Sequence, residues 1–110
     1  MLDDNSFRKQ ADHSLESLKQ SLIVAEDSAD IEVEDQAGAL HISFDDGNRF
    51  VISPNAPVRQ IWISALSTSF KLDWDDAKQD FVLAKSGEQL KALMSRLINQ
   101  QLGEEAVALT

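Results

Sequence analysis

In NAPVRQIWISA, residues 55–65, a proline-containing turn runs into a predicted strand. Apolar and polar side chains alternate along that strand, in the order Gln60, Ile61, Trp62, Ile63 and Ser64. Because a strand sends successive side chains to opposite faces, the isoleucines face a core and Trp62 faces away from it. The largest apolar side chain of the strand therefore stands among polar neighbours, which the fold must explain.

The same two-residue alternation continues on both sides of this stretch. It covers DIEVE (30–34), ALHISF (39–44), RFVIS (49–53), SFKLDW (69–74) and QDFVLA (79–84). DDGN at 45–48 predicts a hairpin turn because Gly47 tolerates positive φ. We therefore expect about six short strands between about residues 30 and 84, antiparallel to one another because their connections are short.

Helical spacing flanks the strands at both ends. One apolar face consists of Phe7, Ala11, Leu15, Leu18 and Leu22, and a second of Leu90, Leu93, Met94, Leu97 and Ile98. The first predicts a helix over about 4–24, with Asp3 or Asp4 as its N-cap. Ser86-Gly87-Glu88-Gln89 fits a capping box and Gly103 a C-terminal stop, so we expect the second helix over about 87–102.

These elements predict one α+β domain spanning residues 1–110. Each strand has one apolar face, and both amphipathic helices need a surface to cover. A two-layer α/β sandwich, ordered helix–six-stranded antiparallel sheet–helix with both helices on one face, satisfies both demands. In the tail, residues 103–110, Val107 and Leu109 could plug the open end between the helices.

Trp62 then lies on the uncovered face of the sheet, beside Gln60 and Ser64. One interpretation is structural: neighbours such as His41, or a loop, partly bury the indole. The other is a protein-binding face, because tryptophan supplies ~150–250 Å² of contact area and is enriched at binding hot spots. The pattern of residues favours the second interpretation and leaves the first open.

Composition narrows the class of protein. The chain has 43% hydrophobic and 26% charged residues, as ordinary globular proteins do. No apolar run approaches the ~20 residues that cross a bilayer, and MLDDNSFRKQADH does not resemble a signal peptide or transit peptide. There is no cysteine, which excludes disulfides, thiolate metal sites and a cysteine nucleophile. We therefore expect a cytoplasmic protein.

Charge is distributed unevenly along the chain. Residues 1–35 contain ten acidic and three basic residues, a net charge of −7, while the other 75 residues have nine and seven, a net of −2. Such asymmetry favours a cationic partner, either metal ions or a basic protein surface. Nucleic acid and anionic membranes would be repelled, so neither is an expected partner.

The acidic residues are candidate metal ligands. They are Asp3, Asp4, Asp12, Glu16, Glu26, Asp27, Asp30, Glu32 and Glu34, with His13 as a further candidate. Carboxylates without thiolates suit hard cations, including iron in either oxidation state and other divalent ions. The spacing forms no closed cage, so weak, exposed sites completed by water are expected. The alternative is a solvated face that protects an edge strand from aggregation.

Several motifs together resemble the frataxin family, specifically its bacterial CyaY type. They are Pro57-x-x-Gln60-Ile61-Trp62, the start Phe7-x-x-x-Ala11-Asp12, Asp30-Ile31-Glu32-Val33-Glu34, Asp73-Trp74 and Ser86-Gly87-Glu88. The resemblance covers nearly the whole chain. It implies weakly bound iron (Fe²⁺ or Fe³⁺) and a role in iron–sulfur cluster assembly, as iron donor, as regulator of the cysteine desulfurase with its scaffold protein, or as both.

The resemblance also implies which residues bind these partners: Asn55, Gln60, Trp62, Ser64 and Lys71. It implies a monomer that can form metal-dependent oligomers. Lys19, Gln20, Ser21 and Ile23 interrupt the family's acidic ridge, whereas Gln60 and Trp62 are intact. Ser53 and Lys71 also depart from residues that are frequent in the family. Partner binding therefore carries over better than metal binding, and a non-metal acidic protein-binding module is the alternative function.

No enzymatic signature accompanies these features. His13 and His41 lie on different predicted elements without a nucleophile motif, and there is no Glu-x-x-His pair for a di-iron site. The four glycines are isolated, so no phosphate-binding loop is present. We expect a protein without catalytic residues.

Overall fold

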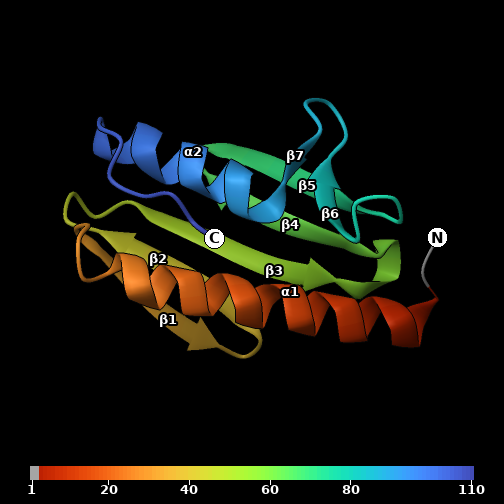
Figure 1. The fold of residues 1–110 in the computed structure, drawn as a ribbon. Helices are drawn as coiled ribbons and strands as arrows, with labels where there is room; N and C mark the ends of the chain where they lie inside the picture. The colour runs from red at the N-terminus through yellow and green to blue at the C-terminus, as the bar shows by residue number, and fades with distance from the viewer. Residues whose placement is uncertain (1–2) are drawn as a thin grey trace.

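The computed structural model describes residues 3–110. Over this range the elements are α1 (Asp4–Ala25), β1 (Ile31–Gln36), β2 (Ala39–Phe44), β3 (Arg49–Asn55), the 3-10 helix η1 (Ala56–Val58), β4 (Gln60–Ala65), β5 (Thr68–Asp75), β6 (Asp80–Leu83), β7 (Glu88–Gln89) and α2 (Leu90–Leu102). All these strands join one antiparallel sheet in chain order, β1 to β7. Both helices lie on the same side of it (Figure 1). The predicted α+β two-layer sandwich is confirmed.

A single apolar core lies between the two layers. Its fully buried members come from both helices and from the sheet, among them Leu18, Ile52, Ile61 and Leu97. Each such side chain contributes about 1.5–3 kcal/mol relative to leaving it in water. Both apolar helix faces expected from the sequence are buried here. The alternation in the strands therefore settles which sheet face the helices cover.

The ends of the helices follow local rules. Oδ1 of Asp3 accepts a hydrogen bond of 2.7 Å from the backbone N–H of Ser6, which makes Asp3 the N-cap of α1. At the other end of the chain, α2 stops at Gly103, whose φ of 76° is in the left-handed region that glycine adopts without strain. Both positions agree with the expected boundaries of the helices.

The predicted start of the second helix was wrong. The capping box does not form: α2 begins at Leu90, and its N-cap Gln89 makes no side-chain capping bond. Instead, Glu88 and Gln89 pair with Leu83 and Val82 as β7, which makes seven strands within residues 3–110 where six were expected. Glu88 also accepts bonds of 2.8 and 2.9 Å from the guanidinium of Arg96 on α2. Tertiary contacts thus hold this segment extended against its local helical signal.

The C-terminal tail returns along the helix side of the molecule, between α1 and α2 (Figure 1). Val107 and Leu109 are half-buried against the core, as expected for a plug at this end. The side chain of Asn99 fixes the tail by accepting bonds from the N–H groups of Ala106 and Val107, each 2.9 Å long. Neither helix of the described chain covers the opposite face of the sheet (Figure 1).

Candidate functional site: the outer sheet face and the acidic edge

The uncovered face of the sheet carries the residues that the sequence placed opposite the core. Ile61 and Ile63 of β4 are 0% and 1% exposed, which fixes the direction of the residues between them. Trp62 points to the other side of the sheet and is half-buried there. The structure therefore keeps Trp62 among polar neighbours, as the alternation in the sequence predicts. A large aromatic ring stands on the face that the helices do not cover.

Side chains of β4 and β5 hold the indole of Trp62. Lys71 on β5 is directly opposite, with its Nζ 4.9 Å from the centroid of the indole ring, a cation–π contact. The indole N–H donates a 2.9 Å bond to Oε1 of Gln60. Nε2 of Gln60 in turn donates a 3.0 Å bond to Oδ1 of Asp73 on β5. His41 is not the neighbour that buries the indole, because it lies two strands away, opposite Val51.

The register brings all five predicted partner-binding residues onto this face. Asn55 on β3 is opposite Gln60, Trp62 is opposite Lys71, and Ser64 is opposite Val51 and Ser69. We call this surface the outer sheet face: Asn55, Gln60, Trp62, Ser64, Lys71 and Asp73. Trp62 makes this surface a candidate for protein binding, because tryptophan is enriched at protein interfaces and among their hot spots. Asp73 is the member that sequence reasoning missed as a binding-face residue, although its alternation with Leu72 and Trp74 placed it there.

Two of the nine acidic candidates have structural partners near the start of α1. Asp3 caps the helix, and the backbone N–H bond from Ser6 lowers the pKa of its carboxyl. Asp4 lies 3.0 Å from a guanidinium nitrogen of Arg59, which follows η1. Both carboxylates thus already have a partner within the chain. Neither lines the two cavities that Asp12, Glu16, Glu26, Asp30 and Glu32 line.

Asp12 and Glu16 lie one turn apart on the exposed side of α1, as their spacing predicts. They line a small cavity of about 110 Å³ together with Lys19 and Asp35. Nζ of Lys19 is 3.5 Å from a carboxylate oxygen of Asp35, so a lysine ammonium already supplies positive charge in this cavity. His13 lines a different cavity, of about 190 Å³, with Lys91 of α2. The structure therefore separates His13 from Asp12 and Glu16.

A second acidic group forms where α1 meets the edge of the sheet. Glu26, Asp30 and Glu32 line a cavity of about 340 Å³, to which the turn after β2 adds Asp45. The sequence did not point to Asp45. It reaches the cavity because Phe44, the last residue of β2, is opposite Ile31, the first residue of β1, and Asp45 follows Phe44 directly. We call this set the acidic edge: Glu26, Asp30, Glu32 and Asp45. Asp27 and Glu34 are exposed and do not line the cavity.

One of these carboxylates also protects the edge strand. Oε2 of Glu26 accepts a 3.1 Å bond from the backbone N–H of Val33 in β1, which is the outermost strand of the sheet. An edge strand with free N–H groups invites pairing with another chain, and this contact removes one such donor. Glu34 accepts a 2.7 Å bond from the side chain of Gln36. The geometry therefore gives Glu26 a part in protecting the edge, and cation binding by these acids stays a prediction.

The acidic residues do not form a closed metal site. Across residues 3–110, no three histidine, aspartate or glutamate side chains converge as the ligands of a metal ion do. The carboxylates of the acidic edge suit hard cations in their chemistry, but most ligands would have to be water. Weak iron binding at these carboxylates stays a prediction.

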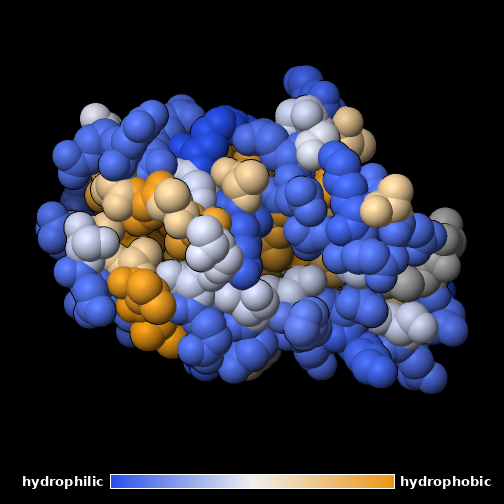
Figure 2. Space-filling view, viewed as in Figure 1, coloured by the Kyte–Doolittle hydropathy of each residue, from blue (hydrophilic) through white to orange (hydrophobic). Residues whose placement is uncertain are grey.

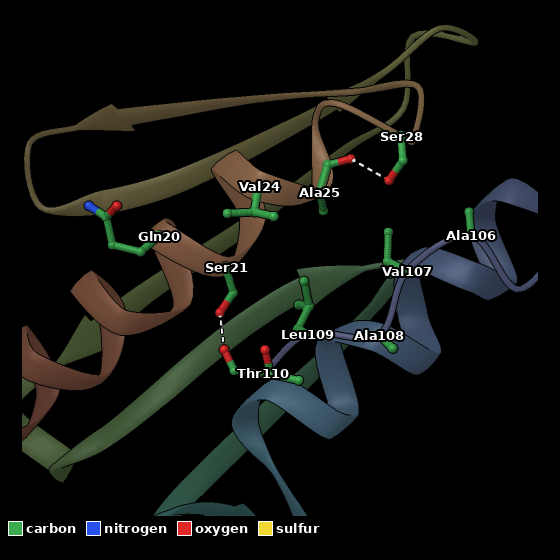
Figure 3. A pocket seen from close by; sticks show the side chains of 10 residues that line it. All are labelled: Gln20, Ser21, Val24, Ala25, Ser28, Ala106, Val107, Ala108, Leu109 and Thr110. Carbon is green, nitrogen blue, oxygen red and sulfur yellow. Dashed lines mark hydrogen bonds between the residues drawn. The ribbon is translucent and has the colours of Figure 1, made fainter.

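A further cavity, lined by other residues, lies between the end of α1 and the tail (Figure 3). It measures about 350 Å³ and is lined by side chains that include Val24, Val107 and Leu109, and the hydroxyl of Ser21 donates a bond to the carbonyl oxygen of Thr110 beside it. Figure 2 shows apolar side chains gathered over this end of α1 and the tail. Val24 is 71% exposed there. None of the predicted site residues lines this cavity.

Neither helix within residues 3–110 has both the length and the apolar character that a membrane span requires.

A family model described as a frataxin-like domain matches residues 1–104. Two similar proteins are each named iron-sulfur cluster assembly protein CyaY. The protein of Pseudomonas fluorescens (strain Pf0-1) is 33% identical over 104 residues, 94% of this chain and 93% of that one. That of Azotobacter vinelandii is 37% identical over 83 residues, 74% of this chain and 76% of that one.

Solved structures agree with this fold. Frataxin from Psychromonas ingrahamii superposes with a TM-score of 0.80 over 94% of each chain, at 19% sequence identity. Yeast frataxin gives a TM-score of 0.67 over 90% of this chain and 82% of its own, also at 19% identity. The family match over residues 1–104 and the identities to the CyaY proteins lead to one conclusion. The chain belongs to the frataxin family and is of the bacterial CyaY type.

Proposed function

We propose that this protein serves iron–sulfur cluster assembly by binding, through its outer sheet face, to the complex of the cysteine desulfurase and its scaffold protein. The CyaY relatives carry that assembly role in their names. The observation that carries the proposal is the position of Trp62 on the uncovered face, held between Lys71 and Gln60. Neither helix of the described chain packs on that ring, which leaves it available to a partner.

The outer sheet face is preorganised for binding. The indole N–H is already satisfied by Gln60, so docking does not leave this polar group buried without a partner. The ring is held in one orientation by neighbours on two strands, which reduces the conformational entropy lost on binding. The net charge of −7 in residues 1–35 would steer a basic partner surface toward the acidic edge.

The test is truncation of the ring. Trp62→Ala should abolish the effect of the protein on sulfide release by the desulfurase–scaffold complex, while the melting temperature stays within a few degrees of wild type. The matched control is Val24→Ala, which truncates an exposed apolar side chain on the helix side of the molecule. Unaltered desulfurase kinetics with Trp62→Ala would refute the proposal.

Iron donation is the second candidate function, and the acidic edge favours it. Four carboxylates line one cavity there, and the ferrous ion would be cargo held mainly through water. An anaerobic NMR titration with Fe²⁺, and separately with the desulfurase, separates the two functions. Shifts by iron confined to the acidic edge, with shifts by the partner on the outer sheet face, would support two surfaces. A protein that Fe²⁺ does not perturb would instead be a non-metal acidic binding module.

We further propose that the protein has no catalytic activity of its own. The titratable side chains of the outer sheet face are Asp73 and Lys71, which contact other side chains of the same face. Cytoplasmic location and a monomeric state that gives way to metal-dependent oligomers remain predictions. Sedimentation with and without Fe²⁺ would measure the latter.

A further inference from the structure

The two tryptophans of the chain satisfy their indole N–H groups in different ways. Trp74 donates directly to a carboxylate, Oδ1 of Asp76, at 2.7 Å. Trp62 donates to the amide oxygen of Gln60 at 2.9 Å, and Gln60 donates to the carboxylate of Asp73 at 3.0 Å. Trp62 is therefore connected to its carboxylate through an intervening amide.

The register explains why these groups meet. Gln60 and Trp62 are two residues apart on β4, and Asp73 and Lys71 are opposite them on β5. Side chains directly opposite in an antiparallel pair lie about 4.5–5.5 Å apart at Cβ, and those two residues apart share a face. The four side chains thus form a square on the outer sheet face, with Trp62 contacting Lys71 on one side and Gln60 on the other.

The direction of the bonds in this square depends on Asp73. A glutamine amide has an acceptor end and a donor end and fits either way round, whereas a carboxylate only accepts and an indole N–H only donates. Because Asp73 accepts from Nε2, the amide oxygen of Gln60 must point toward Trp62. With the amide reversed, its NH₂ group would face the indole N–H, donor against donor.

We propose that Asp73 is a positioning residue for Trp62: by fixing the orientation of the Gln60 amide, it fixes the orientation of the indole on the outer sheet face. Asp73 acts through Gln60: Gln60 accepts the bond from the indole N–H, and Asp73 accepts the bond from the amide group of Gln60. The consequence for partner binding rests on the proposed function, whereas the effect on the indole does not.

The first experiment observes the indole N–H groups directly in the ¹⁵N-labelled protein without a partner. Asp73→Ala should move the Trp62 Nε1–H resonance and make its exchange with water about two- to tenfold faster, which corresponds to the loss of one hydrogen bond. The Trp74 resonance should stay in place, because its acceptor is Asp76. Trp62→Phe assigns the two resonances.

Two further variants separate positioning from charge. Asp73→Asn keeps an acceptor oxygen without the charge and should restore most of the Trp62 resonance position. Glu105→Gln removes one negative charge from an exposed residue of the tail and should leave both resonances unchanged. An unmoved Trp62 resonance in Asp73→Ala overturns the proposal, as does an equal change in Asp73→Ala and Glu105→Gln.

The second experiment measures the dissociation constant for the desulfurase. Asp73→Ala should weaken binding by about two- to tenfold, and Asp73→Asn should recover most of it, because the cost is that of one hydrogen bond. If the Trp62 resonance moves but Trp62→Ala leaves desulfurase kinetics unaltered, the proposed function fails and the positioning role stands. If Trp62→Ala abolishes regulation but the resonance is unmoved in Asp73→Ala, the positioning role fails alone.

Discussion

Lys19 on α1 and Asp35 near the end of β1 form an ion pair of 3.5 Å that joins the first helix to the edge strand. Their side chains are 30% and 45% exposed. Asp12 and Glu16 line the same cavity. A cationic side chain thus stands among three carboxylates and balances part of their negative charge.

Lys19→Gln should therefore increase the affinity for divalent cations. Removing the ammonium leaves Asp12, Glu16 and Asp35 with uncompensated negative charge, which attracts Fe²⁺ or Mn²⁺. The loss of stability without metal should be about 1 kcal/mol or less, as for other exposed ion pairs. Anaerobic calorimetric titration measures the affinity, with Lys9→Gln, an exposed lysine of the same helix, as the matched control. Equal affinities in the two variants would contradict this prediction.

Replacing Asp30, Glu32 and Glu34 by their amides should weaken iron binding and raise the melting temperature. Asp30 and Glu32 line one cavity with two further carboxylates, so removing like charges relieves repulsion. Thermal unfolding at low ionic strength measures the gain, which should shrink as salt screens the charges. A lower melting temperature in the triple variant would show that these acids have stabilising partners.

Asn99→Ala should release the C-terminal tail. The Asn99 side chain accepts from two backbone N–H groups of the tail and donates to the carbonyl oxygen of Val107 at 2.9 Å. Losing these bonds leaves half-buried backbone groups unsatisfied, at a cost of about 1–3 kcal/mol. Urea unfolding measures it, and Gln100→Ala, at an exposed position one residue along the same helix, is the control. The idea fails if the two variants are equally stable.

Glu88→Gln should destabilise the junction between β7 and α2 in a pH-dependent way. Hydrogen bonds from Arg96 lower the pKa of the Glu88 carboxyl below its usual value of 4.5. A lowered carboxyl pKa contributes stability above the unfolded-state value that is lost as the pH falls through the folded-state pKa. The variant should thus be less stable by about 1 kcal/mol or less at pH 7. Melting curves of wild type and variant should converge below pH 4.5; a constant difference would show that the charge is irrelevant.

Local patterns were sufficient to predict the layers of this protein. Alternation in β4 and helical spacing in α1 report which side of each element is buried, and burial is set by side-chain chemistry that the sequence displays. The same patterns failed at Ser86–Gln89, where a local helical signal competes with contacts that are distant in the chain. Pairing with β6 and the bonds from Arg96 hold Glu88 and Gln89 extended, after a turn at Ser86 and Gly87.

The two-layer fold and the outward direction of Trp62 can be predicted from the amino-acid sequence, because side-chain periodicity is a property of each segment alone. The contacts between polar groups cannot: Asp73 meets Gln60, Lys19 meets Asp35, and Asp45 meets the acids of the acidic edge only in the folded chain. Such meetings depend on strand register and on how a helix lies over a sheet. These relationships join residues that no local pattern connects, and so folding alone settles them.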